Sequence, residues 1–215
     1  HPLDQGIKDK IALFCNVPNN RVLQNLDVEH LYEAPLAMEK EHLAQVACEC
    51  LKLECPEPDL TDWKAMVESL RTPTDSVTVA LVGKYTQLHD AYISVVEALK
   101  HGGISHHSVV DIKWVDSETV THDNVDSVLH NVNGILVPGG FGDRGIDGKI
   151  EAITYAREHK IPFLGLCLGM QLAIVEFTRN VVGYNDAHSI ELDPSTTHPV
   201  IALMPDQNGV EDIGG

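Results

Sequence analysis

The second part of the chain alternates short apolar runs with longer stretches in which apolar residues recur at helical spacing. Four short runs predict β-strands, at residues 77–83, 109–115, 134–137 and 161–166. The longer stretches predict helices at 90–101, 124–130, 145–159 and from 172 onward, the first of them ended by Gly102-Gly103. Strands that alternate with helices predict an open, mostly parallel, doubly wound α/β sheet.

The first 75 residues are patterned differently. An apolar run at 10–17 predicts a buried strand, Asp27 is a candidate cap for a short helix over 28–32, and 37–53 predicts a longer helix. These elements are too few to form a domain alone, so we expect the tail of a second α/β domain. Three prolines within 56–75, around one apolar segment, predict a linker with a short helix at 63–70.

We therefore expect three parts. Residues 1–55 form the tail of one domain, residues 56–76 form a linker, and residues 77–215 form a domain truncated at its C-terminal end. The 43% of apolar and 22% of charged residues are typical of a soluble globular protein. The apolar runs are too short to span a membrane, so no membrane partner is expected.

Charge and cysteine content narrow the function classes. The net charge of −17, from 15 basic and 32 acidic residues, argues against non-specific binding of nucleic acid. Nucleotides can still bind in local pockets. The five cysteines of a chain that is neither small nor loop-rich predict reduced thiols and a cytoplasmic location. Cys48, Cys50 and Cys55 lack the spacing of a zinc site, and core or surface thiols are the simpler interpretation.

The most informative stretch is Gly165-Leu166-Cys167-Leu168-Gly169, which lies between a predicted strand and a predicted helix. This is the cysteine form of the nucleophile elbow. Glycines on both sides remove collisions that side chains would make in so tight a turn. The turn also places the thiol at a helix N-terminus, where the dipole favours the reactive thiolate. A buried structural cysteine is the alternative, but the flanking glycines favour a nucleophile.

A second special loop, Pro138-Gly-Gly-Phe-Gly-Asp-Arg-Gly145, follows another predicted strand. Ligands of parallel α/β sheets bind beyond the carboxyl ends of the strands, so this loop and the elbow are expected at one edge. The glycines let backbone amides turn toward an anion, as an oxyanion hole requires. A phosphate cradle is the rival interpretation, but no Walker lysine follows the loop. The amides of Gly140 and Leu168 are the expected donor pair.

The two loops resemble those of the triad glutamine amidotransferases, which release ammonia from glutamine. The resemblance narrows to the CTP synthases when more motifs are included: VGKY at 82–85, DAY at 90–92, EALKHGG at 97–103, PGGFGDRG and GLCLGMQ. The segment KIALFCNV at 10–17 also resembles the end of the synthetase domain of that family. The resemblance therefore covers nearly the whole chain.

The resemblance implies an activity with several small-molecule partners. Enzymes of this family make CTP from UTP, ATP and L-glutamine, with Mg²⁺ serving the ATP step and GTP activating the glutaminase. ATP activates the uracil 4-oxygen, and ammonia displaces the phosphate. The family's habit suggests a homotetramer, and no nucleic-acid partner is expected.

The resemblance also implies residue roles. Cys167 would form a thioester with glutamine, and Gly140 and Leu168 would hold the oxyanion. The other residues expected at the glutamine site are Phe141, Gly169, Met170, Gln171 and Glu191. Lys10 would meet the phosphates of UTP or CTP, and the segment Leu26, Asp27 and Val28 would lie near the ATP adenine. Arg144 is a candidate for the GTP effect, with a plain surface arginine as an equal alternative.

One departure from the family pattern is clear. The family completes its triad with a His-Pro-Glu sequence, and here His198-Pro199 is followed by Val200, at the start of an apolar strand predicted over 200–204. We expect a fragment cut at both ends and unable to hydrolyse glutamine alone. The catalytic His and Glu would then lie beyond Gly215. The magnesium ligands would lie before His1, leaving no metal site in this fragment.

Two other classes of function stay open. Another triad enzyme, such as GMP synthase or a γ-glutamyl hydrolase, would share the two loops but not the segment 10–17. A non-catalytic module with this fold, kept for regulation or assembly, would not need the Cys167 elbow.

Overall fold

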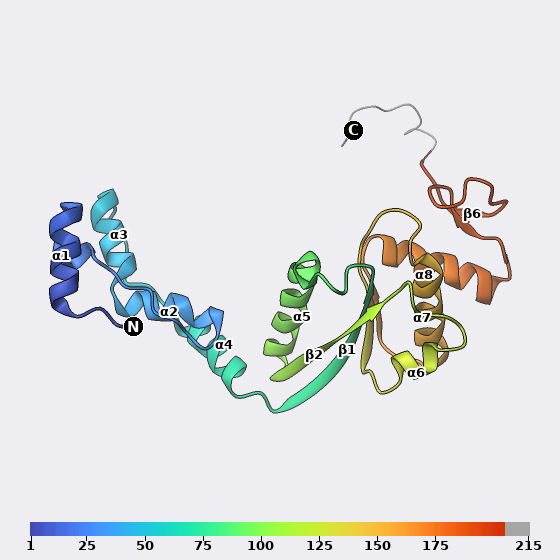
Figure 1. Cartoon of the computed structure of the whole chain (residues 1–215), viewed down its shortest axis with the longest axis horizontal. Coiled ribbons are helices and arrows are strands. Elements are labelled where there is room, and N and C mark those ends of the chain that lie inside the picture. The colour runs from blue at the N-terminus through green and yellow to red at the C-terminus, as the bar shows by residue number, and fades with distance from the viewer. Residues whose placement is uncertain (205–215) are drawn as a thin grey trace. The chain divides into compact units, whose positions relative to one another are not determined.

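The computed structural model describes residues 1–204 (Figure 1). The chain divides into two compact units, the first over His1–Pro73 and the second beginning at Thr74. Within the described residues, no helix is both long enough and apolar enough to cross a membrane.

The first unit is built from helices. These are α1 (Gln5–Cys15), α2 (Ala34–Lys40), α3 (Leu43–Leu51) and α4 (Thr61–Arg71), with 3-10 turns at Asn19–Arg21 and Leu31–Glu33. The predicted linker helix forms as α4 and packs within this unit. The Trp63 indole N–H donates to the Tyr32 carbonyl at 2.8 Å, and Arg71 forms an ion pair with Glu33 at 2.7 Å.

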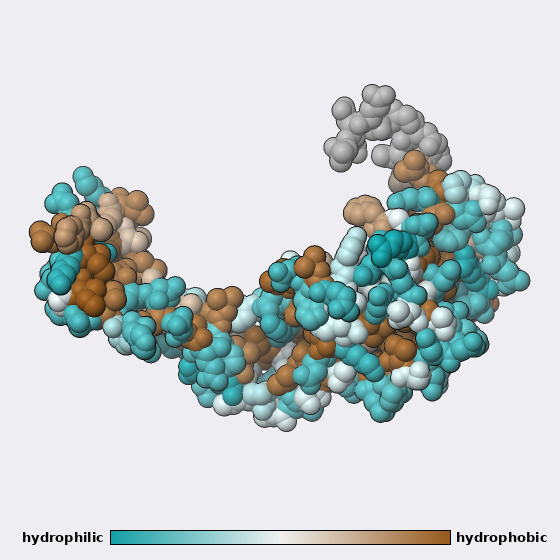
Figure 2. Space-filling model, in the orientation of Figure 1, coloured by the Kyte–Doolittle hydropathy of each residue, from teal (hydrophilic) through white to brown (hydrophobic). Residues whose placement is uncertain are grey.

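The strand predicted over 10–17 is wrong, because these residues belong to helix α1. Asp4 caps the helix by accepting from the Ile7 amide at 2.9 Å, and Asn16 ends it in the left-handed conformation with a φ of 52°. A short apolar run is compatible with a strand or a helix. Here the Asp4 cap stabilises the helix. Leu13 and Phe14 of α1 are exposed to solvent. Figure 2 shows apolar side chains at the surface over α1.

Two further predictions for this unit need correction. No helix forms over 28–32, and Asp27 caps nothing, because the chain stays irregular until the turn at Leu31–Glu33. The helix predicted over 37–53 is divided at Glu41 and His42, where His42 has a φ of 58° and starts α3 in a new direction. The expected α/β tail therefore contains helices, 3-10 turns and irregular segments, and no strand forms within residues 1–55.

The second unit confirms the predicted parallel sheet. Its strands are β1 (Asp75–Gly83), β2 (Ser108–Asp116), β3 (Gly134–Val137) and β4 (Phe163–Gly165), in the order β2-β1-β3-β4 with every pair parallel. In register, Leu81 pairs with Trp114 on one side and with Leu136 on the other. The chain reverses its direction of winding between β1 and β3, which is the usual ligand-binding point of such sheets.

Helices cover both faces of this sheet, as Figure 1 shows. The helix α5 (Ile93–Ser105) packs on Leu81 and Leu136, whereas α6 (Val125–Leu129), α7 (Ile146–Glu158) and α8 (Leu168–Phe177) enclose Ala80, Val82 and Val137. Adjacent residues of β1 thus face opposite cores, which explains why this strand is apolar without a break.

Some boundaries in this unit differ from the predicted ones. Gly102-Gly103 lies inside α5 and does not end it, and a 3-10 turn at His89–Tyr92 precedes the helix. The last strand of the main sheet is shorter than the predicted 161–166. Residues 200–204 contribute only to β6 (Pro199–Ile201), which pairs with β5 (His188–Ser189).

Candidate active site

Cys167 occupies a strained turn between β4 and α8. Its φ of 49° and ψ of −107° lie outside the regions that residues other than glycine normally adopt. Three backbone bonds hold the turn: the Leu166 amide donates to the Val137 carbonyl at 2.9 Å, the Gly169 amide to Leu166 at 2.9 Å, and the Gln171 amide to Cys167 at 3.1 Å. Strain of this kind concentrates at functional sites, where the surrounding structure enforces it.

The flanking glycines are required by close backbone contacts. A Cβ atom on Gly165 would lie 2.5 Å from the carbonyl carbon of Gly169, and one on Gly169 would lie 2.1 Å from the Val137 carbonyl oxygen. Real Cβ atoms do not make contacts this short. The expected steric reason for the two glycines is therefore confirmed.

The turn presents Cys167 to solvent as the residue preceding α8. The loop after β3 lies against it, because a Cβ atom on Gly139 would be 3.4 Å from the Cβ of Cys167. The elbow and the glycine loop thus meet at one sheet edge, as the strand order requires.

The structure also brings Gly140 and Leu168 together. A Cβ atom on Gly140 would lie 3.7 Å from Cδ2 of Leu168. Within residues 1–204, neither the Gly140 amide nor the Leu168 amide donates a hydrogen bond to the protein. Two amides without protein acceptors, one from each loop beside a nucleophile, can together bind an oxyanion.

The other expected glutamine contacts differ in their surroundings. Phe141 and Met170 are exposed, Gln171 is half-buried, and Gly169 is buried against β3. Glu191 is exposed in the turn after β5, and its amide donates to Ser189 Oγ at 3.3 Å. Among the described residues, no hydrogen bond or ion pair joins Glu191 to the elbow.

Two lysines lie beside the glycine loop, and the sequence analysis did not predict either as a site residue. Lys84 follows β1, and its Nζ donates to the Phe141 carbonyl. Lys149 lies in the first turn of α7 and is 1% exposed. Burial, and then the positive charge of Lys84, lower the pKa of Lys149 to about 8. Lys84 lies within the VGKY motif, whereas Lys149 sits in an ordinary helical pattern that gives no sign of burial.

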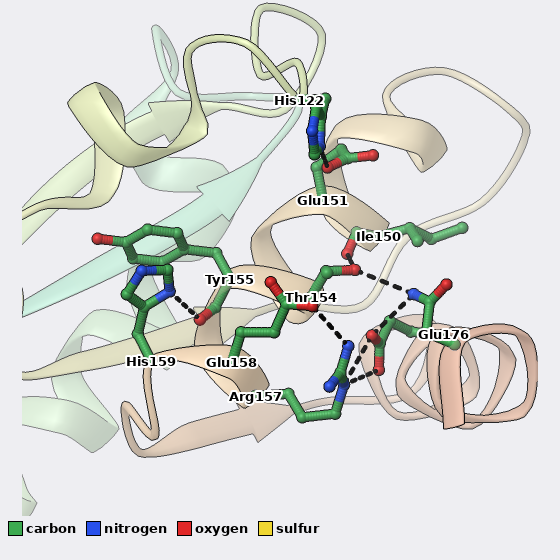
Figure 3. Close-up of polar contacts among 10 residues, drawn as sticks. His122, Ile150, Glu151, Thr154, Tyr155, Arg157, Glu158, His159 and Glu176 are labelled. Atoms are coloured by element: carbon green, nitrogen blue, oxygen red, sulfur yellow. Dashed lines mark hydrogen bonds and ion pairs between the residues drawn. The ribbon is translucent and has the colours of Figure 1, made fainter. Parts of the chain in front are cut away.

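A partly buried ion pair joins the helix that follows the elbow to the neighbouring helix (Figure 3). Arg157 of α7 donates through Nε to both carboxylate oxygens of Glu176 in α8, at 2.9 and 3.2 Å, and Asn180 donates to the same carboxylate at 2.9 Å. Glu176 is 1% exposed, and its carboxylate raises the pKa of Arg157. The pair therefore helps to fix the position of α8 and of the elbow at its start.

Arg144 and His198 each contact a carboxylate side chain. The exposed Arg144 forms an ion pair with Glu118, which follows β2. His198 contacts Asp186 Oδ1 through Nδ1 at 2.5 Å and stacks on Tyr184 with ring centroids 4.3 Å apart. Hydrogen bonds, from Thr197 first and His198 second, hold the pKa of Asp186 well below its usual range. His198 thus fastens the β5–β6 segment.

The proposed nucleotide contacts of the first unit lie on separate segments. Lys10 is exposed on α1, whereas Asp27 is exposed and Leu26 and Val28 are half-buried in the irregular segment before α2. The same unit contains an open cavity of about 450 Å³, bordered by Lys8 but not by Lys10. Lys8 forms an ion pair with Glu41, which also lines this cavity, at 2.8 Å.

One group of described residues could offer three ligands to a metal ion. Within residues 1–204, one group of three potential ligands lies within 4.8 Å, comprising Glu29, His30 and Glu33. Glu33 is already bound by Arg71 through two contacts of 2.7 and 2.8 Å, which also lower its pKa. Mg²⁺ prefers carboxylates and water to histidine, so we assign no metal chemistry to this group.

Comparison with known families gives two matches. Residues 87–205 match the model of the class-I glutamine amidotransferases, and residues 1–53 match that of the CTP synthase N-terminus. The first match alone covers more than half of the chain and includes both special loops.

Several proteins of similar sequence or structure are named CTP synthase or CTPS. The chain is 59% identical to a CTP synthase of Ruminiclostridium cellulolyticum and 55% identical to one of Geobacillus kaustophilus, over 99% and 100% of its own length. It spans 40% of the length of these relatives. The glutaminase domain of Trypanosoma brucei CTPS with bound acivicin is 44% identical, with a TM-score of 0.58 over 61% of this chain and 51% of that one.

Proposed function

The chain belongs to the class-I glutamine amidotransferases, and on that premise we propose that Cys167 is the nucleophile of a glutamine-hydrolysing site. The observation that carries the proposal is the strained, exposed Cys167 beside the two uncommitted amides of Gly140 and Leu168. A structural thiol would need neither the strain nor the exposure.

The chemistry follows from this arrangement. The Cys167 sulfur attacks the carboxamide carbon of glutamine, and the carbonyl π electrons move to the oxygen, which the amides of Gly140 and Leu168 stabilise. Collapse of this intermediate breaks the C–N bond, and protonation of the leaving nitrogen gives ammonia and a γ-glutamyl thioester. Water then cleaves the thioester to glutamate and restores the thiol.

Substrate binding is proposed for the residues around the elbow. The exposed Phe141 and Met170 offer apolar surface to the glutamine side chain, and Gln171 offers an amide. Glu191 is a candidate for binding the α-amino group of the substrate. His-Pro-Glu does not occur within residues 1–204, so the general base is not assigned to a described residue.

For the whole protein, the proposed reaction is the ATP-dependent amination of UTP to CTP by the released ammonia. Support comes from the relatives named CTP synthase and from the match of residues 1–53 to the N-terminus of that family, which GMP synthase would not explain. Lys10 would meet UTP or CTP phosphates, the segment 26–28 would approach the ATP adenine, and Arg144 would serve activation by GTP. Mg²⁺ for the ATP step, a cytoplasmic location and a homotetrameric assembly belong to the same proposal.

The test compares two nitrogen sources in the intact protein. Cys167→Ala should abolish CTP formation from glutamine and leave formation from added ammonia nearly unchanged, because the second reaction does not use the thiol. The matched control is Cys50→Ala, which removes an exposed thiol of the first unit and should behave as wild type. Loss of both activities in Cys167→Ala, or retention of both, would reject the proposed role.

A further inference from the structure

Lys149 is a buried lysine that the chemistry above leaves unused. Its side chain is among the largest fully buried ones in the protein. Within residues 1–204, it has no ion pair and no side-chain hydrogen bond. A lysine is rarely buried without a partner, because the loss of hydration destabilises the charged form.

The ammonium of Lys149 lies beside the proposed oxyanion site. A Cβ atom on Gly140 would be 3.8 Å from Lys149 Nζ, 3.9 Å from Lys84 Cε and 3.7 Å from Leu168 Cδ2. Gly140 is thus surrounded by two lysine side chains and by the first residue of α8. Lys84 is anchored on the neighbouring Phe141 carbonyl, which leaves Lys149 as the uncommitted charge.

Other charged groups on the elements around α7 are engaged elsewhere. Glu176 of α8 binds Arg157, and Asp126 of α6 accepts from the Tyr155 hydroxyl at 3.2 Å. Burial and the positive charge of Lys84 both lower the pKa of Lys149. The adjoining elbow contributes the Cys167 thiol. Two positive charges therefore lie beside Gly140, those of Lys84 and Lys149.

We infer that Lys149 is a positioning residue for glutamine hydrolysis, which keeps a buried positive charge beside the Gly140 peptide to stabilise the oxyanion bound there. The inference rests on the proposed glutaminase function and deepens it. Lys149 keeps its proton during the whole reaction. It transfers nothing to the substrate, and its field acts when the carbonyl π electrons move to oxygen. A charge in a dry, preorganised setting stabilises a developing anion far more than it would in water.

The inference predicts a change in kcat and in its pH dependence. Lys149→Met, which keeps most of the side-chain length and removes the charge, should lower kcat for glutamine hydrolysis about tenfold, less than the hundredfold or more for loss of a direct donor. KM for glutamine should change little. In wild type, the rate should fall above about pH 8, where Lys149 loses its proton. That decline should be absent in Lys149→Met and move to higher pH in Lys149→Arg.

The experiment uses the intact protein with three lysine variants and two nitrogen sources. Lys160→Met, at an exposed position just after α7, is the control and should match wild type. Ammonia-dependent synthesis should be unchanged in every variant, because that reaction does not use the glutaminase site. Wild-type kcat and pH profile in Lys149→Met would overturn the inference, as would equal losses in Lys149→Arg and Lys149→Met. Glutamine use that survives Cys167→Ala would instead reject the proposed function itself.

Discussion

The backbone of Gly169 packs so closely on Val137 that a Cβ atom would lie 2.1 Å from the Val137 carbonyl oxygen. This contact joins the first turn of α8 to the end of β3, and it is what brings the Cys167 turn against the glycine loop. The same carbonyl accepts the Leu166 amide at 2.9 Å, so one peptide group fixes both sides of the elbow.

Gly169→Ala should therefore distort the elbow. Because backbone must move to admit the methyl group, we expect a loss of about 3 kcal/mol or more in stability, above the usual cost of overpacking. Glutamine hydrolysis should fall with it. Unfolding by urea and the glutaminase rate measure the two effects.

Gly102→Ala is the control for that change. Nothing lies within 4 Å of the Cβ position at Gly102, which is inside α5, so alanine should stabilise the protein by about 0.5–1 kcal/mol through helix propensity. Equal stability of the two variants would show that the Gly169–Val137 contact is not a constraint.

Arg157→Ala should destabilise the packing of α7 on α8. It leaves the buried Glu176 carboxylate without its main partner, and we expect a cost of roughly 3 kcal/mol, at the low end for a broken buried pair because Arg157 is 33% exposed. Glu158→Gln removes the other, exposed carboxylate that contacts Arg157, at 3.2 Å, and should have little effect. Denaturation midpoints that fall equally in both variants would contradict this ranking.

Lys149 should make stability depend on alkaline pH. Its folded pKa of about 8 lies below the ordinary 10.5, so the unfolded chain binds more protons between these values and stability should rise with pH across that window. Below pH 8 the folded protein bears the full penalty of the buried charge. Lys149→Met should remove that penalty and increase stability at pH 7 by about 3 kcal/mol, at roughly 1.4 kcal/mol per pKa unit.

Hydrogen exchange of the α7 and β3 amides at pH 7 is the measurement for this prediction. Stronger protection in Lys149→Met, together with slower glutamine hydrolysis, would separate an electrostatic role from a structural one. Weaker protection would indicate that Lys149 serves the packing of the helix.

The sequence predicts the sheet well because its signals are local. Strand β3 has the predicted bounds, since Gly134–Val137 is an apolar run closed by the Pro138-Gly139 loop. The elbow is predictable for the same reason, because its glycines and cysteine are adjacent in the chain.

The wrong or missing predictions concern residues whose packing contacts are not visible in the local sequence pattern. Gly102-Gly103 looks like a helix end, yet Gly103 serves close packing inside α5, where a Cβ atom would be 2.5 Å from the Ser108 carbonyl oxygen. Lys149 has the sequence context of an exposed helical lysine. Its burial beside Gly140 follows only from how α7 packs under the loop.

The central claim, that Cys167 is the nucleophile, is tested most directly by covalent labelling of the intact protein. An electrophilic chloroketone analogue of glutamine would be added, and the modified residue identified by peptide mass spectrometry. We predict a single adduct on Cys167, slowed by L-glutamine, with Cys15, Cys48, Cys50 and Cys55 unmodified over the same period. An adduct on another residue that L-glutamine slows, or glutamine hydrolysis that continues with Cys167 fully modified, would contradict the account.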